Sequence, residues 1–213
     1  EKSWRGQSLM RDVFLGNFRI DLLERLTLDE PERPEFWEFY HRLADFLRDK
    51  VDPAEIDASG EYPAEVVAGL AELGAFGLKI PTDYGGLGLT HPEYVRVMQL
   101  LGGHDGNVAA LLSAPQAIGV PQPIKLFGTE EQKKQYLPGV ASGDIRFLTV
   151  AATEPDSGAN MAELASTARR DGDDWVINAS KVLISFAEHT RLMILLARAD
   201  EGTTLFLLDL DQV

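Results

Sequence analysis

Residues 149–160 form the segment whose residue types best suit ligand binding. It reads Thr-Val-Ala-Ala-Thr-Glu-Pro-Asp-Ser-Gly-Ala-Asn, so a β-branched run that ends at Thr153 is followed by proline, serine and glycine. These residues favour an irregular turn, and the free backbone N–H groups of such a turn can hold a phosphate. An ordinary surface loop has the same composition. The segment is therefore a candidate phosphate-binding turn, with an ordinary loop as the alternative.

Other combinations that support catalysis or metal binding are sparse. The four histidines do not pair at metal-ligand spacing, which predicts no metal site. The chain has no cysteine, so disulfides, thiolate ligands and cysteine nucleophiles are excluded. The glycine-rich stretch 85–88 follows a helix and a proline rather than a strand. A tight turn with positive φ is therefore favoured over a dinucleotide-binding loop.

The elements that must position this segment are helices in the first part of the chain, because apolar residues recur there at helical spacing. Prolines and glycines mark the expected ends. The predicted helices are 31–52, with Pro34 in its first turn; one from Pro63 to about Gly74; one from Pro92 to Gly102 and Gly103; a buried helix over 105–128, broken near Pro121 and Pro123; and a short helix that Thr129 caps and that ends near Pro138.

The period changes near residue 144, after which short runs of β-branched, leucine and aromatic residues alternate with glycine and aspartate. We predict an α+β fold: an N-terminal all-helical domain, then an antiparallel, β-barrel-like domain that is incomplete. Residues 1–30 are an extension packed on the body, 31–144 the helical domain and 145–213 the partial β-domain. The predicted strands are 147–152, 175–178, 182–186, 192–197 and 204–208, with a hairpin turn over Asp171–Asp174.

Composition limits the classes of partner. The 213 residues include 34 acidic and 20 basic side chains, a formal net charge of −14, which argues against nucleic-acid binding. The hydrophobic content of 45% is enough for a globular core. No apolar run has the length of a membrane span, and no signal peptide is visible at the start. We therefore expect no transmembrane segment and a cytoplasmic location.

Four stretches, in order, resemble the acyl-CoA dehydrogenase family. Thr153-Glu-Pro-Asp-Ser-Gly-Ala-Asn160 resembles that family's first β-domain motif, and Asn178-Ala-Ser-Lys-Val-Leu-Ile-Ser-Phe186 resembles its second. Leu73–Leu89, which includes Tyr84-Gly-Gly-Leu-Gly-Leu89, and Leu126–Gly143, which includes Gly128-Thr-Glu-Glu-Gln132, resemble its helical domain. His104-Asp105 and the N-terminal segment are most similar to the very-long-chain branch.

The resemblance implies FAD-dependent α,β-dehydrogenation of an acyl-CoA thioester, with electrons passed to an acceptor flavoprotein by a homodimer or homotetramer. It places Val150, Ala152 and Thr153 along the flavin edge, and Gly158 and Ala159 near the pyrophosphate, with Ala159 also near the acyl-CoA. Leu183 and Ser185 would face the flavin ring, and the buried helix at 108–118 would help wall the acyl pocket. In this family the catalytic carboxylate comes from a C-terminal helical domain, so no catalytic residue is assigned within 1–213.

Several residues depart from the family pattern. Leu183 stands where tryptophan is usual, Phe186 where asparagine is usual, Ala159 where serine is usual, Asn160 where aspartate is usual, and Ala179 where glycine is common. These changes remove an aromatic stacking surface and a hydroxyl group. Two alternatives therefore stay open beside the dehydrogenase: a redox-inactive acyl-CoA-binding or partner subunit with the same fold, and a related acyl-CoA oxidase.

Overall fold

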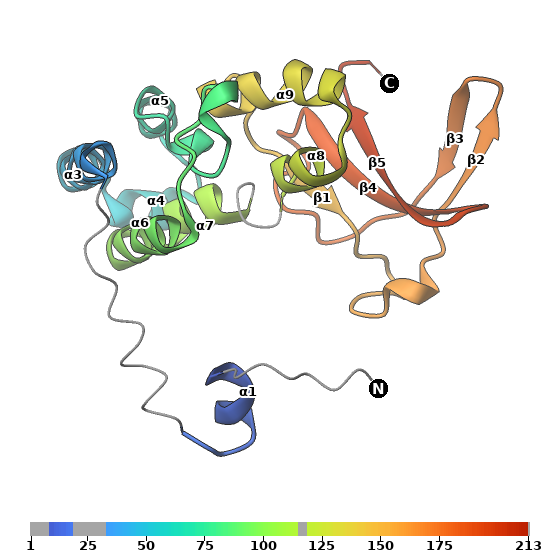
Figure 1. Ribbon diagram of the computed structural model, residues 1–213, viewed down its shortest axis with the longest axis horizontal. Helices are drawn as coiled ribbons and strands as arrows, with labels where there is room; N and C mark the ends of the chain where they lie inside the picture. The colour runs from blue at the N-terminus through green and yellow to red at the C-terminus, as the bar shows by residue number, and fades with distance from the viewer. Residues whose placement is uncertain (1–8, 19–32, 115–118, 213) are drawn as a thin grey trace.

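The computed structural model describes residues 9–18, 33–114 and 119–212 (Figure 1). Within them, helices come first and a sheet follows, as predicted. The α-helices are α1 (Leu9–Phe14), α3 (Pro34–Lys50), α4 (Pro53–Ser59), α5 (Ala64–Glu72), α6 (His91–His104), α7 (Gly106–Ser113), α8 (Pro121–Phe127) and α9 (Glu130–Ser142). The strands are β1 (Thr149–Ala151), β2 (Thr167–Asp171), β3 (Asp174–Asn178), β4 (Leu192–Ala199) and β5 (Gly202–Asp209). Of the predicted N-terminal extension, only residues 9–18, which include α1, are described.

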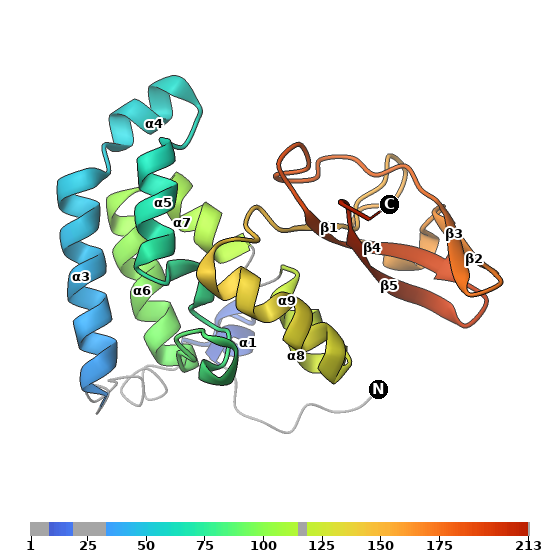
Figure 2. The same cartoon turned by 90° about the horizontal axis from the view of Figure 1, so that it is seen from above.

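The helical part is built around the amphipathic helix α3. Pro34 occupies its first turn, as predicted, and its apolar side chains recur every three or four residues. That face packs against α5 and α6, which lie beside α3 (Figure 2). Nineteen buried residues from α3 to α7 form one core. Fully buried members of this core include Leu43, Leu70, Leu101 and Leu111.

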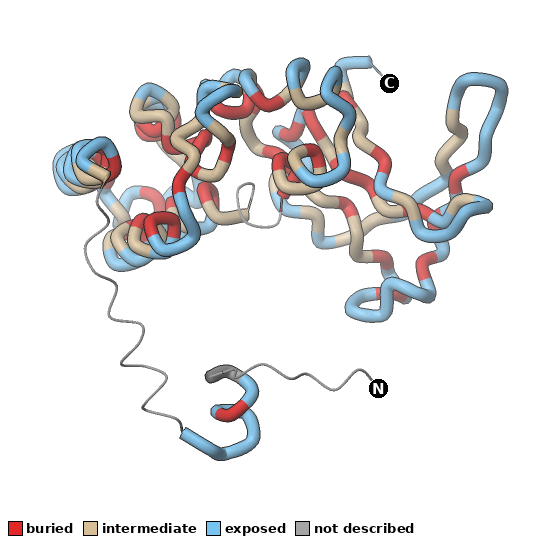
Figure 3. The backbone as a smooth tube through the Cα atoms, in the orientation of Figure 1, coloured by how far each residue is buried: buried red, intermediate tan, exposed pale blue. Residues whose placement is uncertain are grey.

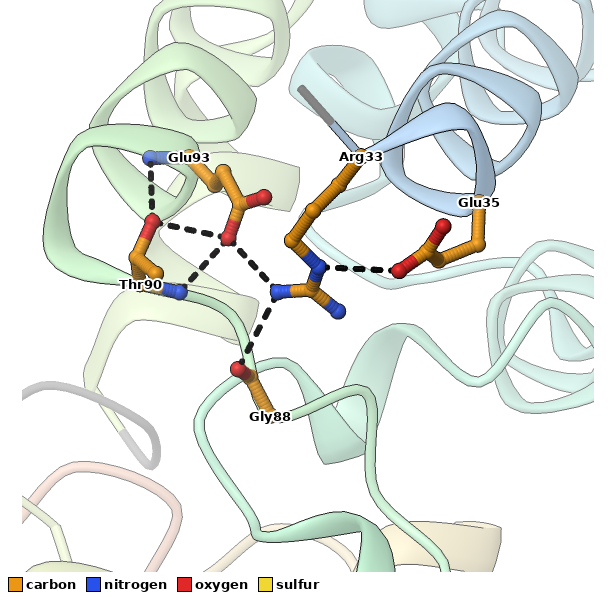
Figure 4. Close-up of polar contacts among 5 residues, drawn as sticks. All are labelled: Arg33, Glu35, Gly88, Thr90 and Glu93. Atoms are coloured by element: carbon orange, nitrogen blue, oxygen red, sulfur yellow. Dashed lines mark hydrogen bonds and ion pairs between the residues drawn. The ribbon is translucent and has the colours of Figure 1, made fainter. Parts of the chain in front are cut away.

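An ion pair between the partly exposed Arg33 and the buried Glu93 joins the start of α3 to the start of α6 (Figure 4). The carboxylate of Glu93, only 1% exposed, accepts hydrogen bonds from Arg33 at 3.0 Å and from the backbone and hydroxyl of Thr90, each at 2.7 Å. Thr90 and Glu93 also form the capping box of α6. Arg33 donates further to the carbonyl of Gly88. The glycine-rich turn is thereby tied to both helices.

Three predicted helix ends are wrong. Helix α6 runs through Gly102 and Gly103 and ends at His104. The next residue, Asp105, has an extended backbone, and its carboxylate caps α7 by accepting from the Val108 N–H at 2.6 Å. The predicted break near Pro121 and Pro123 lies before Pro121, since Pro121 begins α8 and Pro123 lies inside it. Helix α9 has the predicted Thr129 capping box but continues past Pro138 to Gly143, which has a φ of 78°. The short helix α4, capped by Asp52, was not predicted.

The sheet is mixed and open within the described residues, so the antiparallel, barrel-like prediction is wrong in those two respects. Strand β4 is central and pairs along one edge with antiparallel β5. Along its other edge it pairs in parallel with β1 and then, at a single register position, with β2. The β2–β3 hairpin turns at Gly172, as predicted, and extends outward with most of its residues exposed (Figure 3). Because β1 and β2 follow each other along β4, the hairpin leaves the sheet instead of closing it.

Helices α8 and α9 lie between the helical part and the sheet (Figure 2). Ile124 of α8 and Leu137 of α9 pack in one buried cluster with Leu192 and Ile194 of β4. The segment from α9 to β1 also contributes Ile145 and Leu148 to this cluster. The end of β1 is therefore held between a helical layer and the central strand.

Candidate functional site

The candidate phosphate-binding turn begins where β1 ends. Residues 152 and 153 are outside the strand, and Glu154 and Ser157 then exchange backbone hydrogen bonds of 2.8 and 3.2 Å, closing a tight turn. The hydroxyl of Ser157 donates to the carbonyl of Asn160 at 2.7 Å. Gly158 and Ala159 are exposed on the loop that follows. The irregular turn predicted from proline, serine and glycine is confirmed.

The second candidate segment, predicted as a strand over 182–186, is not a strand. Leu183 and Phe186 have left-handed backbone conformations, with φ of 57° and 61°, which interrupt any extended ladder. Residues 185–189 form turns. The ring of Phe186 packs against that of Phe147 at 5.8 Å between centroids and an interplanar angle of 45°, and Phe147 is itself left-handed with a φ of 57°. Apolar composition suggested a strand here, but composition alone does not show a change in the sign of φ.

Three contacts bring the two segments together. Val182 donates its backbone N–H to the carbonyl of Thr153 at 3.0 Å. The hydroxyl of Thr149 donates to the carbonyl of Ser185 at 2.7 Å. Between them, the Lys181 ammonium donates to the carbonyl of Ala152 at 3.2 Å. The chain from 181 to 185 therefore lies along the end of β1.

Five of the seven predicted cofactor-binding residues lie on these two adjacent segments: Val150, Ala152, Thr153, Leu183 and Ser185. Gly158 and Ala159 lie on the neighbouring turn, and no hydrogen bond between described residues joins them to 183–185.

The chemistry of the adjacent segments fits a flavin. In the part of the chain that the structure describes, the hydroxyl groups of Thr153 and Ser185 have no hydrogen-bond partner. Leu183, two residues before Ser185, is 90% exposed, so an apolar side chain on the same segment is open to a ligand. An amphipathic ring with polar edges and an apolar face matches that donor set. At residue 158, a Cβ would meet nothing within 4 Å, so the turn has open space around it.

A buried ion pair that the residue types did not predict joins Glu154 and Lys181, whose side chains are 3% and 7% exposed. The Lys181 ammonium lies 2.7 Å from Oε1 of Glu154. Glu154 also accepts from the backbone N–H groups of Ala165 and Ser166, at 2.5 and 3.1 Å. The only sequence signal was one acidic and one basic residue, each inside one of the two motifs.

The electrostatics of Glu154 argue against its acting as a base. Burial alone raises the pKa of this carboxyl, but hydrogen bonds from Lys181, Ser166 and Ala165 outweigh that effect and lower the pKa from 4.5 to about 2. A carboxylate with so low a pKa and with both oxygens occupied has little tendency to take a proton. Glu154 is therefore structural, not catalytic.

A hollow of about 700 Å³ lies next to the second segment, on the side of Ile184 and Phe186. Its other lining residues include Phe147 and His189, whose rings are 5.8 Å apart, and Tyr62 from the helical part. Leu183 and Ser185 are not among its lining residues. Along this segment, the predicted flavin-facing residues Leu183 and Ser185 therefore alternate with Ile184 and Phe186, which line the hollow.

The predicted wall of the acyl pocket is described only in part. Val108, Leu111 and Leu112 of α7 are fully buried in the helical core, whereas residues 115–118 lie outside the described residues. Among the described residues, no cluster of three or more histidine, cysteine or acidic side chains is arranged to hold a metal ion. Their helices also include none that is both long and apolar enough to cross a membrane.

Comparison with known proteins places this geometry in context. The models of the N-terminal and middle domains of acyl-CoA dehydrogenases match residues 34–144 and 149–213. A probable acyl-CoA dehydrogenase, FadE10 of Mycobacterium tuberculosis (strain H37Rv), is 39% identical over 201 residues, covering 93% of this chain and 30% of that protein. The mouse mitochondrial very long-chain specific acyl-CoA dehydrogenase is 39% identical over 177 residues, covering 81% of this chain and 27% of that protein.

Among solved structures, an acyl-CoA dehydrogenase from Bacillus anthracis complexed with FAD superposes with a TM-score of 0.74 at 29% identity. The match covers 89% of this chain and 34% of that chain. The present chain thus spans about 30% of the length of the FadE10 relative.

Proposed function

The chain belongs to the acyl-CoA dehydrogenase family, and we propose on that basis that the full-length protein catalyses FAD-dependent α,β-dehydrogenation of an acyl-CoA thioester. The observation that carries the proposal is the adjacency of the segments 150–153 and 182–185, which presents two unpartnered hydroxyls and one exposed apolar side chain together. When bound there, FAD supplies the two-electron acceptor that takes a hydride from the β carbon of the substrate.

The residues of this chain bind and orient that cofactor. The proposed roles are that Val150 and Ala152 border the ring edge and that Leu183 covers part of its face. Thr153 and Ser185 donate hydrogen bonds to the ring edge, where charge develops on reduction. Gly158 and Ala159, on the exposed turn, are proposed to lie at the pyrophosphate, with Ala159 also beside the acyl-CoA. We propose that this turn and the 183–185 segment serve different parts of one extended cofactor.

The base that removes the α proton is assigned outside residues 1–213. Glu154 is excluded by its hydrogen bonds to Lys181, Ala165 and Ser166, and the family relatives are much longer than this chain. We propose that this chain contributes binding and orientation of the cofactor and that the group that abstracts the α proton lies outside residues 1–213.

We further propose an electron-accepting flavoprotein as the physiological oxidant and a homodimer or homotetramer as the assembly. Two other functions remain as outcomes of the test. An oxidase would pass electrons to oxygen and produce peroxide. A redox-inactive acyl-CoA-binding or partner subunit is favoured by Leu183, which offers no aromatic surface for stacking, and by Ala159, which has no hydroxyl.

The test uses purified full-length protein, supplied with acyl-CoA thioesters of stepped chain length. A dehydrogenase reduces an added electron acceptor and yields little peroxide in air, whereas an oxidase yields peroxide without the acceptor. A protein that binds acyl-CoA but is colourless and inert after incubation with FAD would contradict the proposal.

The Ser185 hydroxyl gives a residue-level test of the same proposal. We expect Ser185→Ala to lower kcat by about tenfold or more, because one donor to the developing charge is lost. Ser180→Ala is the matched control, since Ser180 is an exposed serine on the same segment with no proposed role. Equal kcat values for the two variants would remove Ser185 from the site.

A further inference from the structure

The ion pair between Glu154 and Lys181 joins the two segments that border the proposed flavin site, and the inference drawn from it rests on the proposed function. Each motif contributes one partner, 27 residues apart. Lys181 precedes the segment 182–185, and Glu154 directly follows Thr153. The pair is therefore placed to act on the geometry between the segments.

Few other contacts hold the segments in register. Strand β1 uses its ladder to pair with β4, and residues 181–185 belong to no strand. Between residues 149–154 and 181–185, the structure gives Val182 to Thr153, Thr149 to Ser185, and the two bonds of the Lys181 ammonium. Lys181 thus supplies half of these four hydrogen bonds.

The pair is also tied to a third stretch. Glu154 accepts from the backbone N–H groups of Ala165 and Ser166. Ser166 directly precedes β2, and its carbonyl accepts from the backbone N–H of Arg198 in β4 at 2.9 Å. One buried carboxylate therefore ties the end of β1, the start of β2 and the 181–185 segment together. Buried ion pairs contribute little net stability compared with apolar replacements. The effect of this pair is therefore on the relative position of the three stretches rather than on the free energy of folding.

We propose that Glu154 and Lys181 are positioning residues, which hold the 181–185 segment against the end of β1 and so set how Thr153, Leu183 and Ser185 face the flavin. Neither side chain touches the flavin; both act through the backbone that carries those three residues. Loss of the pair shifts the segment by releasing the Ala152 carbonyl and the Glu154 carboxylate together. The flavin is then bound more weakly and in an altered environment, while the helical core is unchanged.

The experiment compares variants of the full-length protein for FAD affinity and for the visible spectrum of the bound flavin. The single variants are Glu154→Gln and Lys181→Met, and Glu154→Gln/Lys181→Met is combined in one chain. The double variant leaves no unpaired charge in the interior, so it avoids the large penalty that a single variant carries. Lys181→Arg is the conservative variant, because it retains a cation that can donate to the Ala152 carbonyl oxygen and to the Glu154 carboxylate.

The control is Arg191→Met, which removes ion pairs to Asp209 at the end of β5 and to Asp211 just after it. The Arg191 side chain is 46% exposed, and none of its contacts involves the two segments. We expect the double variant to raise the Kd for FAD by about tenfold or more, equivalent to at least about 1.4 kcal/mol. Its flavin band should shift at an unchanged folded fraction. Arg191→Met should leave both readouts unchanged, and Lys181→Arg should recover part of the affinity.

The outcomes distinguish failure of the proposed function from failure of the positioning role alone. If the wild-type protein binds no FAD, the proposed function fails and the positioning role fails with it. If the wild type binds FAD and the folded double variant binds it with the same Kd and spectrum, the positioning role alone is overturned. A double variant that does not fold would also overturn it, because the pair would then be needed for the fold rather than for the site.

Discussion

At the residue scale, backbone conformation rather than composition distinguishes the site. Leu183 and Phe186 are left-handed in a segment whose apolar residues favour an extended chain. Left-handed backbone at non-glycine residues persists only where the surrounding structure enforces it, and such residues cluster at ligand-binding segments. The motif positions could be predicted from residue types, but the sign of φ could not, since neither side chain signals it.

Leu183 provides a stability test of this strain. Replacing Leu183 with asparagine should stabilise the flavin-free full-length protein by about 0.5–1 kcal/mol, because asparagine tolerates left-handed backbone far better than leucine. Leu183 is 90% exposed, so little packing is lost. The measurement is the urea midpoint. Leu126→Asn, on the exposed side of α8, is the control and should be neutral or slightly destabilising. A loss of stability in Leu183→Asn would show that the left-handed residue carries no strain.

Glu154 gives a pH test. Its pKa is about 2 in the folded protein and near 4.3 in an unfolded chain. The folded state therefore favours the ionised form, so its stabilisation is fully present above the unfolded pKa and is lost as the pH falls toward 2. We expect the free energy of unfolding of the wild type to fall more steeply between about pH 5 and pH 2 than that of the Glu154→Gln/Lys181→Met variant. Parallel curves would mean that the pair does not depress this pKa.

At the scale of elements, helices were predictable from their period and several of their starts from capping residues, whereas three of their ends were not. The repeats of α3 and α5 and the capping box of α9 follow directly from residue spacing. Glycines and prolines were misleading as stop signals. Helix α6 ends where Asp105 caps α7, and α9 tolerates Pro138 because the carbonyl left unpaired belongs to the exposed residue Lys134. The strand order of the sheet also depends on long-range pairing. Local sequence does not show that β1 and β2 both pair with the same edge of β4.

Two glycines differ in whether the structure leaves room for a side chain. Gly86 lies in the glycine-rich turn, and a Cβ there would lie 2.1 Å from the carbonyl oxygen of Ile80, so Gly86→Ala should cost several kcal/mol or prevent folding. Gly102 lies within α6 with nothing near a Cβ. Gly102→Ala should therefore stabilise the protein by about 0.5–1 kcal/mol. Thermal unfolding checks both, and a destabilised Gly102→Ala variant would contradict the helical assignment of residue 102.

At the scale of the whole molecule, the described chain combines a helical layer and an open sheet that meet at the end of β1. The α+β class and the order of its parts could be predicted from the change of period near residue 144. The adjacency of the two motifs could not, because it depends on contacts between residues 27 to 36 apart. The resemblance to a family supplied an expectation of that adjacency, and the hydrogen bonds give its physical basis.

The central claim is that this adjacency builds a flavin site in a protein that oxidises acyl-CoA. The most direct measurement is anaerobic: full-length protein loaded with FAD is mixed with a saturated acyl-CoA while the visible band of the flavin is followed. We predict that the band bleaches as the flavin takes up the two electrons from the substrate, and that it returns when an electron acceptor is added. A bound flavin whose band stays unchanged across acyl-CoA thioesters of every chain length, or a protein that retains no flavin, would contradict the account.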